Sequence, residues 1–198
     1  MGPFILGGIM KLKLENFFLA SLSFLISGVL APSWGQSQAP VGQQAPLFFR
    51  NAVSRYFQAP EQQVVLAGHG KIKDEELPVL FLIVQKAQVS QEKVTRLRGK
   101  GASWLTTARH FGVTPDVFYV PLKNPVDPFK KPLGYFKSRK KNQWRKIVLK
   151  DKEIVNLVNL KFLSEFYKSP PETIAGWHGQ GKSFVEINAE LQARNENR

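Results

Sequence analysis

The positions of apolar residues along the chain predict helices. Four of them follow one another at intervals of three and four residues, which places them on one helical face: Leu77, Leu80, Phe81 and Val84. Residues 154–167 are apolar at nearly every position, so we expect this helix to lie at the centre of the fold. These patterns predict a mainly α-helical domain over residues 49–198.

A second pattern is an internal duplication, in which residues 72–113 resemble residues 149–191. The first copy starts with the letters IKDEEL and the second with LKDKEI. After three extra residues in the second copy, a later block matches at constant spacing, so that Gly99, Gly101 and Ser103 correspond to Gly179, Gly181 and Ser183. Because a repeated unit usually packs against its neighbour, we expect the two copies to contact each other.

Each copy predicts three helices joined by short turns. Asp74 and Asp151 have the position of N-caps for the first helices, with further acids in the first turn. The glycines are expected to end the middle helices through left-handed conformations, and Ser103 and Ser183 to cap the third.

Two short runs are typical of β-structure instead. Residues 63–66 and 144–149 each precede the first helix of a copy and are rich in β-branched or aromatic residues. The fold class that follows is mainly α, with a duplicated three-helix unit and room for a small two-stranded β-ribbon.

The N-terminal region has the pattern of an export signal. Lys11 and Lys13 precede the uncharged apolar stretch Asn16–Ala31, and Gly35 ends a small-residue cleavage site. Residues 1–35 are therefore predicted to be a signal peptide, with Met10 as an alternative start, and residues 36–48 a flexible linker rich in Gln and Pro. The predicted location is periplasmic or secreted. An uncleaved membrane anchor is the alternative, because the stretch approaches the roughly 20 residues of a span.

The excess positive charge is concentrated between the two copies, in an insert over residues 122–148. The chain carries a formal net charge of +13, and residues 122–150 hold ten basic residues against one acid, Asp127. Such a segment attracts anionic polymers or membrane surfaces. Eight candidate anion-binding residues follow: Lys130, Lys131, Lys137, Arg139, Lys140, Lys141, Arg145 and Lys146.

Aromatic residues are interleaved with these cations, and we predict that they stack on the partner. They are Phe129, Tyr135, Phe136 and Trp144. The alternative is a solvated, mobile loop whose charge only keeps the protein in solution.

Two motif matches lack the context that their function needs. Residues 176–183 fit the phosphate-loop letters G-x-x-x-x-G-K-S, but no strand precedes them and the first copy has Ala102 in place of the lysine. Residues 103–118 resemble the helix-turn-helix of recombinases and sigma-type factors, but Pro121 cuts the recognition helix short. We therefore expect no nucleotide and no cofactor.

Catalytic and metal-binding patterns are equally weak. The chain has no cysteine, and its histidines, His69, His110 and His178, lie far apart without metal-ligand spacing. Asn156 and Asn159 stand one turn apart in the apolar helix and could line a pocket or satisfy buried backbone groups. We predict no catalytic residue and no metal.

The signal peptide, the D-x-E-[LI] helix start and the G-x-G-x-S-[WF] turn together resemble a group of uncharacterised exported proteins of Gram-negative bacteria. That resemblance implies an exported helical protein and no particular activity. The sequence favours a non-enzymatic binding protein of the cell envelope that contacts nucleic acid, lipopolysaccharide or a wall polymer. The alternatives are a protein–protein interaction scaffold and a cell-wall enzyme, which would need Asp74, Glu76, Asn156 and His110 in one cleft.

Overall fold

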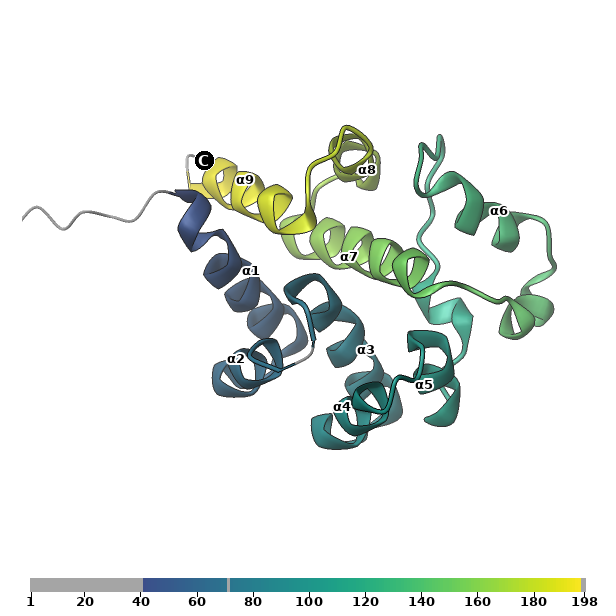
Figure 1. Ribbon diagram of the computed structural model, residues 1–198. Helices are drawn as coiled ribbons and strands as arrows, with labels where there is room; N and C mark the ends of the chain where they lie inside the picture. The colour runs from purple at the N-terminus through teal and green to yellow at the C-terminus, as the bar shows by residue number, and fades with distance from the viewer. Residues whose placement is uncertain (1–40, 71, 197–198) are drawn as a thin grey trace, which may run out of the picture. The chain divides into compact units, whose positions relative to one another are not determined.

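The computed structural model describes residues 41–70 and 72–196, which form nine α-helices, three short 3₁₀ helices and no strand (Figure 1). The predicted mainly α-helical fold is confirmed, whereas the predicted β-ribbon is wrong. Residues 63–66 lie inside α2 (Glu61–Gly68), where Val64 and Ala67 are buried on one helical face. Ile147 and Leu149 do alternate with the exposed Val148, but this short extended segment packs on the helical core and pairs with no strand among the described residues.

The helix α1 (Val41–Phe57) starts inside the segment predicted to be a flexible linker, so residues 41–48 are helical. Its apolar positions follow helical spacing, and Phe49, Val53 and Phe57 are buried in the core. The predicted signal peptide, residues 1–35, lies outside the described residues. None of the helices in the described part of the chain is long and apolar enough to cross a membrane.

Each of the two similar segments folds into three successive α-helices. The first segment contains the 3₁₀ helix η1 (Asp74–Glu76), α3 (Leu77–Ala87), α4 (Gln91–Gly99) and α5 (Trp104–His110). The second contains α7 (Asp151–Tyr167), α8 (Pro171–Gly179) and α9 (Phe184–Glu196).

The turns within the two segments have the same geometry. Gln88 ends α3 at φ 52° and Lys168 ends α7 at φ 54°. Gly101 and Gly181, at φ 87° and 100°, follow α4 and α8 in the left-handed region that glycine adopts without strain. Of the predicted left-handed glycines these two are confirmed, whereas Gly99 and Gly179 are the last residues of their helices.

The predicted N-caps of the third helices, α5 and α9, are correct. The predicted N-caps at the start of each segment are one residue too late in the chain. The Ser103 hydroxyl accepts the Thr106 amide at 3.1 Å, and the Ser183 hydroxyl accepts the Glu186 amide at 3.2 Å. The N-caps of η1 and α7 are Lys73 and Lys150 rather than the aspartates. Their backbone amides donate to Glu76 and Glu153, so the acid three residues on provides the cap at both helix starts.

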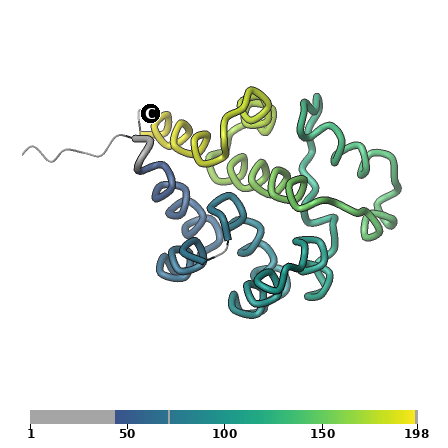
Figure 2. The backbone as a smooth tube through the Cα atoms, in the orientation of Figure 1, coloured from purple at the N-terminus to yellow at the C-terminus, as the bar shows by residue number. Residues whose placement is uncertain are grey.

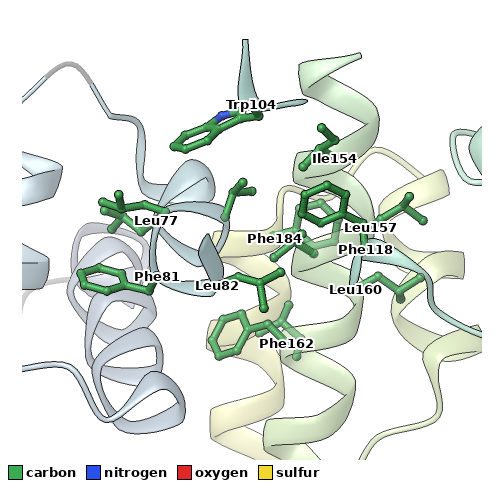
Figure 3. Packing of buried hydrophobic residues seen from close by; sticks show 14 of the residues in the cluster. Leu77, Phe81, Leu82, Trp104, Phe118, Ile154, Leu157, Leu160, Phe162 and Phe184 are labelled. Carbon is green, nitrogen blue, oxygen red and sulfur yellow. The ribbon is translucent and has the colours of Figure 1, made fainter. Parts of the chain in front are cut away.

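The long helix α7 is the centre of the fold, as its apolar pattern predicts. It packs against α1, α3, α5, α8 and α9. Figure 3 shows buried residues of α3 and α7 in one cluster with Trp104, Phe118 and Phe184. Since burial of one such large apolar side chain contributes about 1.5–3 kcal/mol, this shared core joins the two segments into one folding unit.

After α5 the chain passes through η2 (Pro115–Phe118), and the insert then forms α6 (Lys130–Lys137) and η3 (Lys141–Lys146) before the chain enters α7 (Figure 2). Its apolar residues anchor it in the core: Phe129, Leu133, Phe136 and Ile147 are each at most 1% exposed. The insert is therefore a folded part of the domain with cations on its outside.

Candidate functional site

The eight candidate anion-binding cations, here called the basic surface, are all exposed on or beside α6 and η3. None forms an ion pair with an acid in the described part of the chain. One of them is fixed locally, because Arg139 Nη1 donates to the Tyr135 carbonyl at 3.1 Å. These cations lie on an ordered scaffold, and their charge is not compensated by the protein itself.

The four aromatic residues predicted to stack on a partner differ in burial. Phe129 and Phe136 are buried, and Tyr135 and Trp144 are half-buried. The Trp144 indole donates to the Phe136 carbonyl at 3.0 Å, and its ring packs 5.1 Å from the Phe136 ring and 4.7 Å from the Tyr119 ring, centre to centre. The apolar faces of these rings stabilise the insert, so the rings of Phe129 and Phe136 are not open to a partner.

A second candidate site is a cavity of about 990 Å³, here called the acidic pocket. It lies between η1, the start of α7, the turn from α8 to α9, and residues 127–128 of the insert. Five carboxylates line it, with three lysines: Asp74, Glu75, Glu76, Asp127 and Asp151, and Lys73, Lys152 and Lys182. The pocket is thus locally acidic on a protein whose net charge is strongly positive.

Two of these acids are bound on both oxygens by the protein itself. Glu76 accepts the Arg98 guanidinium at 2.6 Å and the Trp104 indole at 2.8 Å on one oxygen, and the Lys73 amide at 3.1 Å on the other. Asp151 accepts the Trp104 amide at 2.7 Å and Arg98 at 2.8 Å. The Arg98 guanidinium also lies 4.4 Å from the Trp104 ring centre. This network holds α4, α5 and α7 together.

The network also connects the two segments in a reciprocal way. Asp151, at the start of the second segment, accepts the first amide of α5 in the first segment. Glu75, at the start of the first, accepts the Phe184 amide, the first of α9 in the second, at 2.7 Å. Each segment therefore caps the third helix of the other, where the helix dipole favours a negative charge.

The two asparagines singled out in the sequence have separate roles. Asn159 is fully buried, and its amide donates to the Glu75 carbonyl at 2.7 Å and the Val155 carbonyl at 2.8 Å. Asn156 is 4% exposed and lines the acidic pocket. The two alternatives, a pocket residue and a group that satisfies buried backbone, thus each apply to one asparagine.

The cluster that an enzyme would need forms only in part. Asp74, Glu76 and Asn156 line the acidic pocket, but His110 lies at a separate surface hollow beside Arg96 and Phe111. The histidine at the pocket is His178, whose Nδ1 lies 2.8 Å from the Lys182 carbonyl and whose ring stacks on Phe184 at 4.1 Å. Spacing gave no signal for His178, because the pocket that it lines is completed by residues from 73–76, 127–128 and 151–156, which are distant in the chain.

The two motif matches lie in turns between helices. Residues 176–183 form the end of α8 and the turn into α9, so no strand leads into the phosphate-loop letters. Pro115–Phe118 forms a 3₁₀ turn in which Pro115 and Phe118 are buried, in the place where a recognition helix would start. Within residues 41–70 and 72–196, no group of three His, Cys, Asp or Glu side chains has the geometry to hold a metal ion.

Glu186 belongs to the cap of α9, together with the pocket residue Ser183. Its carboxylate accepts the Ser183 hydroxyl at 2.7 Å and the Ser183 amide at 2.8 Å. These two bonds to the charged form lower the pKa of Glu186. The carboxylate is therefore held ionised at the helix N-terminus.

Comparisons of the chain with protein-family models, with curated proteins and with solved structures found no match. The resemblance to exported Gram-negative proteins stays a prediction, and both candidate sites rest on their own chemistry.

Proposed function

We propose that this protein is an exported, non-enzymatic binding protein that contacts a phosphate-bearing polymer or surface of the cell envelope through its basic surface. The observation that supports this proposal is a group of eight exposed cations with no acidic partner among the described residues. Unpaired cations attract polyanions, and contact releases the counterions that are condensed on the polyanion. This release favours binding at low salt.

The core of the insert supports the same partner class. Because Phe129 and Phe136 are buried, they leave the cations to provide the contact rather than base stacking. Recognition by charge alone is independent of sequence, which suits lipopolysaccharide, anionic lipid or a phosphate-containing wall polymer. An ordered scaffold also reduces the entropy lost on binding.

Export and duplication are part of this proposal. Export rests on the sequence of residues 1–35 and gives the protein access to envelope anions. Duplication of a three-helix unit is supported by the matching turns at Gln88 and Lys168 and at Gly101 and Gly181. The basic insert then lies between the copies, with only its apolar residues in their common core.

The test uses a variant in which four cations of the basic surface are neutralised together by the substitutions K137Q, R139Q, K140Q and K141Q. Binding is measured to vesicles containing phosphatidylglycerol, to lipopolysaccharide and to duplex DNA over a range of salt. Each cation near an anionic membrane contributes about 1 kcal/mol, so we expect affinity for the vesicles to fall by at least about tenfold. The slope of log affinity for DNA against log salt should also become less steep, by roughly one unit for each phosphate that the variant no longer neutralises.

A matched control neutralises the same number of exposed cations on α3 and α4: K86Q, K93Q, R96Q and K100Q. This control changes the net charge equally but leaves the basic surface intact. The proposal is contradicted if both variants lose equal affinity, or if the insert variant binds as tightly as the wild type. A protein partner whose binding ignores salt would favour an interaction scaffold instead.

A further inference from the structure

The short link between η3 and α7 carries an apolar side chain on a cationic face. Its backbone is extended at both ends, Ile147 and Lys150. Successive side chains of an extended segment point to opposite sides, and burial follows this alternation, because Ile147 and Leu149 are 1% and 3% exposed. The side that faces solvent therefore carries Lys146, Val148 and Lys150. Val148 is 68% exposed and lies between the two lysines.

The rest of the molecule holds this link in place. Its two inward side chains pack in the hydrophobic core. Arg109 Nη2, from α5, donates to the Ile147 carbonyl at 3.0 Å. Arg109 is exposed and, like Lys146 and Lys150, forms no ion pair with an acid in the described part of the chain. Val148 therefore projects from a fixed backbone beside three uncompensated cations.

The charges around an exposed apolar residue decide what it can contact, because single exposed apolar residues are common on protein surfaces. Leu66, on α2, is as exposed as Val148, at 70%, but lines a hollow with Gln63 and Glu92. An anionic surface is attracted to the surroundings of Val148 and has no such attraction to those of Leu66. The two residues thus form a matched pair that differs in local charge.

The combination of cations and an apolar side chain favours one class of polyanion. Nucleic acid and soluble wall polymers offer phosphates to the cations but no apolar interior to a valine. A bilayer with anionic headgroups offers both. Each cation near its surface adds roughly fivefold to the affinity, and apolar side chains enter the boundary between headgroups and acyl chains. The apolar stems of lysines can lie along this boundary while their ammonium groups stay at the phosphates.

We propose that the partner of the basic surface is an anionic lipid bilayer, and that the face formed by Lys146, Val148 and Lys150 touches it with Val148 in the headgroup region. This inference rests on the proposed function, because a bilayer is one member of the partner class given above. Lys146 belongs to the basic surface, and Arg109 and Lys150 extend the contact beyond it. Val148 is the residue that distinguishes a bilayer from a soluble polyanion.

The first test places a fluorescent label on this face. The chain has no cysteine, so V148C provides a single site for a nitrobenzoxadiazole label, and L66C provides the matched control. Each labelled protein is mixed with phosphatidylglycerol vesicles, with phosphatidylcholine vesicles and with duplex DNA. We expect phosphatidylglycerol alone to raise the emission at position 148, by at least about twofold, because the label enters the headgroup region. The emission at position 66 should stay constant.

The second test uses two variants of Val148 that keep the net charge. V148T replaces a methyl group by a hydroxyl at the same shape, and should lose about threefold in affinity for phosphatidylglycerol vesicles. V148W adds a ring that favours bilayer interfaces, and should gain at least about fivefold. Neither variant should change the affinity for duplex DNA by more than about twofold, because neither alters a cation. An unchanged Tm checks that both variants fold as the wild type does.

The proposal is overturned if the label at position 148 does not respond to phosphatidylglycerol, if the labels at 148 and 66 respond equally, or if V148W binds the vesicles no more tightly than the wild type. A response at position 148 to DNA as large as that to vesicles would overturn it in favour of nucleic acid.

The two proposals fail in different ways. If the variant with four neutral residues on the basic surface loses affinity for vesicles and DNA while the label at position 148 does not respond, the proposed function stands and the bilayer contact is wrong. If that variant binds every polyanion as tightly as the wild type, the proposed function itself is wrong.

Discussion

The acidic pocket and the basic surface use charge in opposite ways. In the pocket, Glu76 and Asp151 are bonded on both oxygens, and Arg98 joins them at 2.6 and 2.8 Å. On the basic surface, none of the eight cations has an acidic partner in the described part of the chain. Paired, partly buried charge contributes to the stability of the fold, whereas unpaired surface charge is free for a partner.

The same contrast exists within the pocket itself. The hydrogen bonds of Glu76 and Asp151 hold the segments together, whereas Glu75 uses one carboxylate oxygen and the Asp127 side chain forms no hydrogen bond with a described residue. Asn159 donates to two backbone carbonyls, although its buried side-chain oxygen has no hydrogen-bond partner among the described residues.

The largest effect is expected from E76A. The change removes the acceptor of the Trp104 indole and of the Lys73 amide and one acceptor of the Arg98 guanidinium, in a site where the side chains of Glu76 and Arg98 are 15% and 17% exposed. We expect a loss of about 3 kcal/mol in the free energy of unfolding, measured with urea. Glu153 holds the equivalent cap with only the Lys150 amide as donor, so E153A should lose about 1 kcal/mol. Equal losses of stability in E76A and E153A would show that the bonds of Glu76 to Arg98 and Trp104 add no stability beyond that of the cap.

A smaller loss is expected from D151A. Asp151 accepts the Trp104 amide and Arg98 but is 37% exposed, so water replaces part of the lost interaction. We expect the free energy of unfolding to fall by about 2 kcal/mol in the same urea measurement. K152A, at the exposed neighbouring residue, should stay within about 0.5 kcal/mol of the wild type. A large effect of K152A would contradict the division between paired and unpaired charge.

The cap of α9 gives a smaller effect that depends on pH. S183A removes the hydroxyl that accepts the Glu186 amide, and should cost about 1 kcal/mol at neutral pH. It should also raise the pKa of Glu186 toward the ordinary glutamate value, followed by NMR titration. In the wild type the folded-state pKa is lowered, so the stabilisation is present above about pH 4.5 and is lost as the pH falls through the folded-state pKa. An unchanged titration in S183A would contradict the assigned cause.

The smallest effect on stability is expected on the basic surface. Neutralising Lys137, Arg139, Lys140 and Lys141 together breaks no ion pair with a described acid, so the free energy of unfolding should change by less than about 0.5 kcal/mol for each residue. Lower repulsion among the remaining cations can raise the free energy of unfolding. Urea unfolding beside the binding assay checks this expectation, and a loss of several kcal/mol would mean that these cations hold the fold together.

Local patterns in the sequence determine the helices, their order and most of their ends. Helical spacing of apolar residues, the serine caps at Ser103 and Ser183, and the glycines at Gly101 and Gly181 act between residues close in the chain, and the structure confirms them. The all-round apolar pattern of α7 also predicts its central place. A β-like run at residues 63–66 is misleading, because so short an apolar run fits a helix as well as a strand.

Only the tertiary structure decides which polar groups are satisfied. The acceptors for the amides of Trp104 and Phe184 come from the opposite segment, and the acidic pocket gathers residues of η1, α7, the insert and the turn before α9. The sequence also cannot show that Phe136 is buried while its neighbour Lys137 is exposed. Those outcomes depend on contacts between distant residues, and a cavity exists only once every surrounding helix is in place.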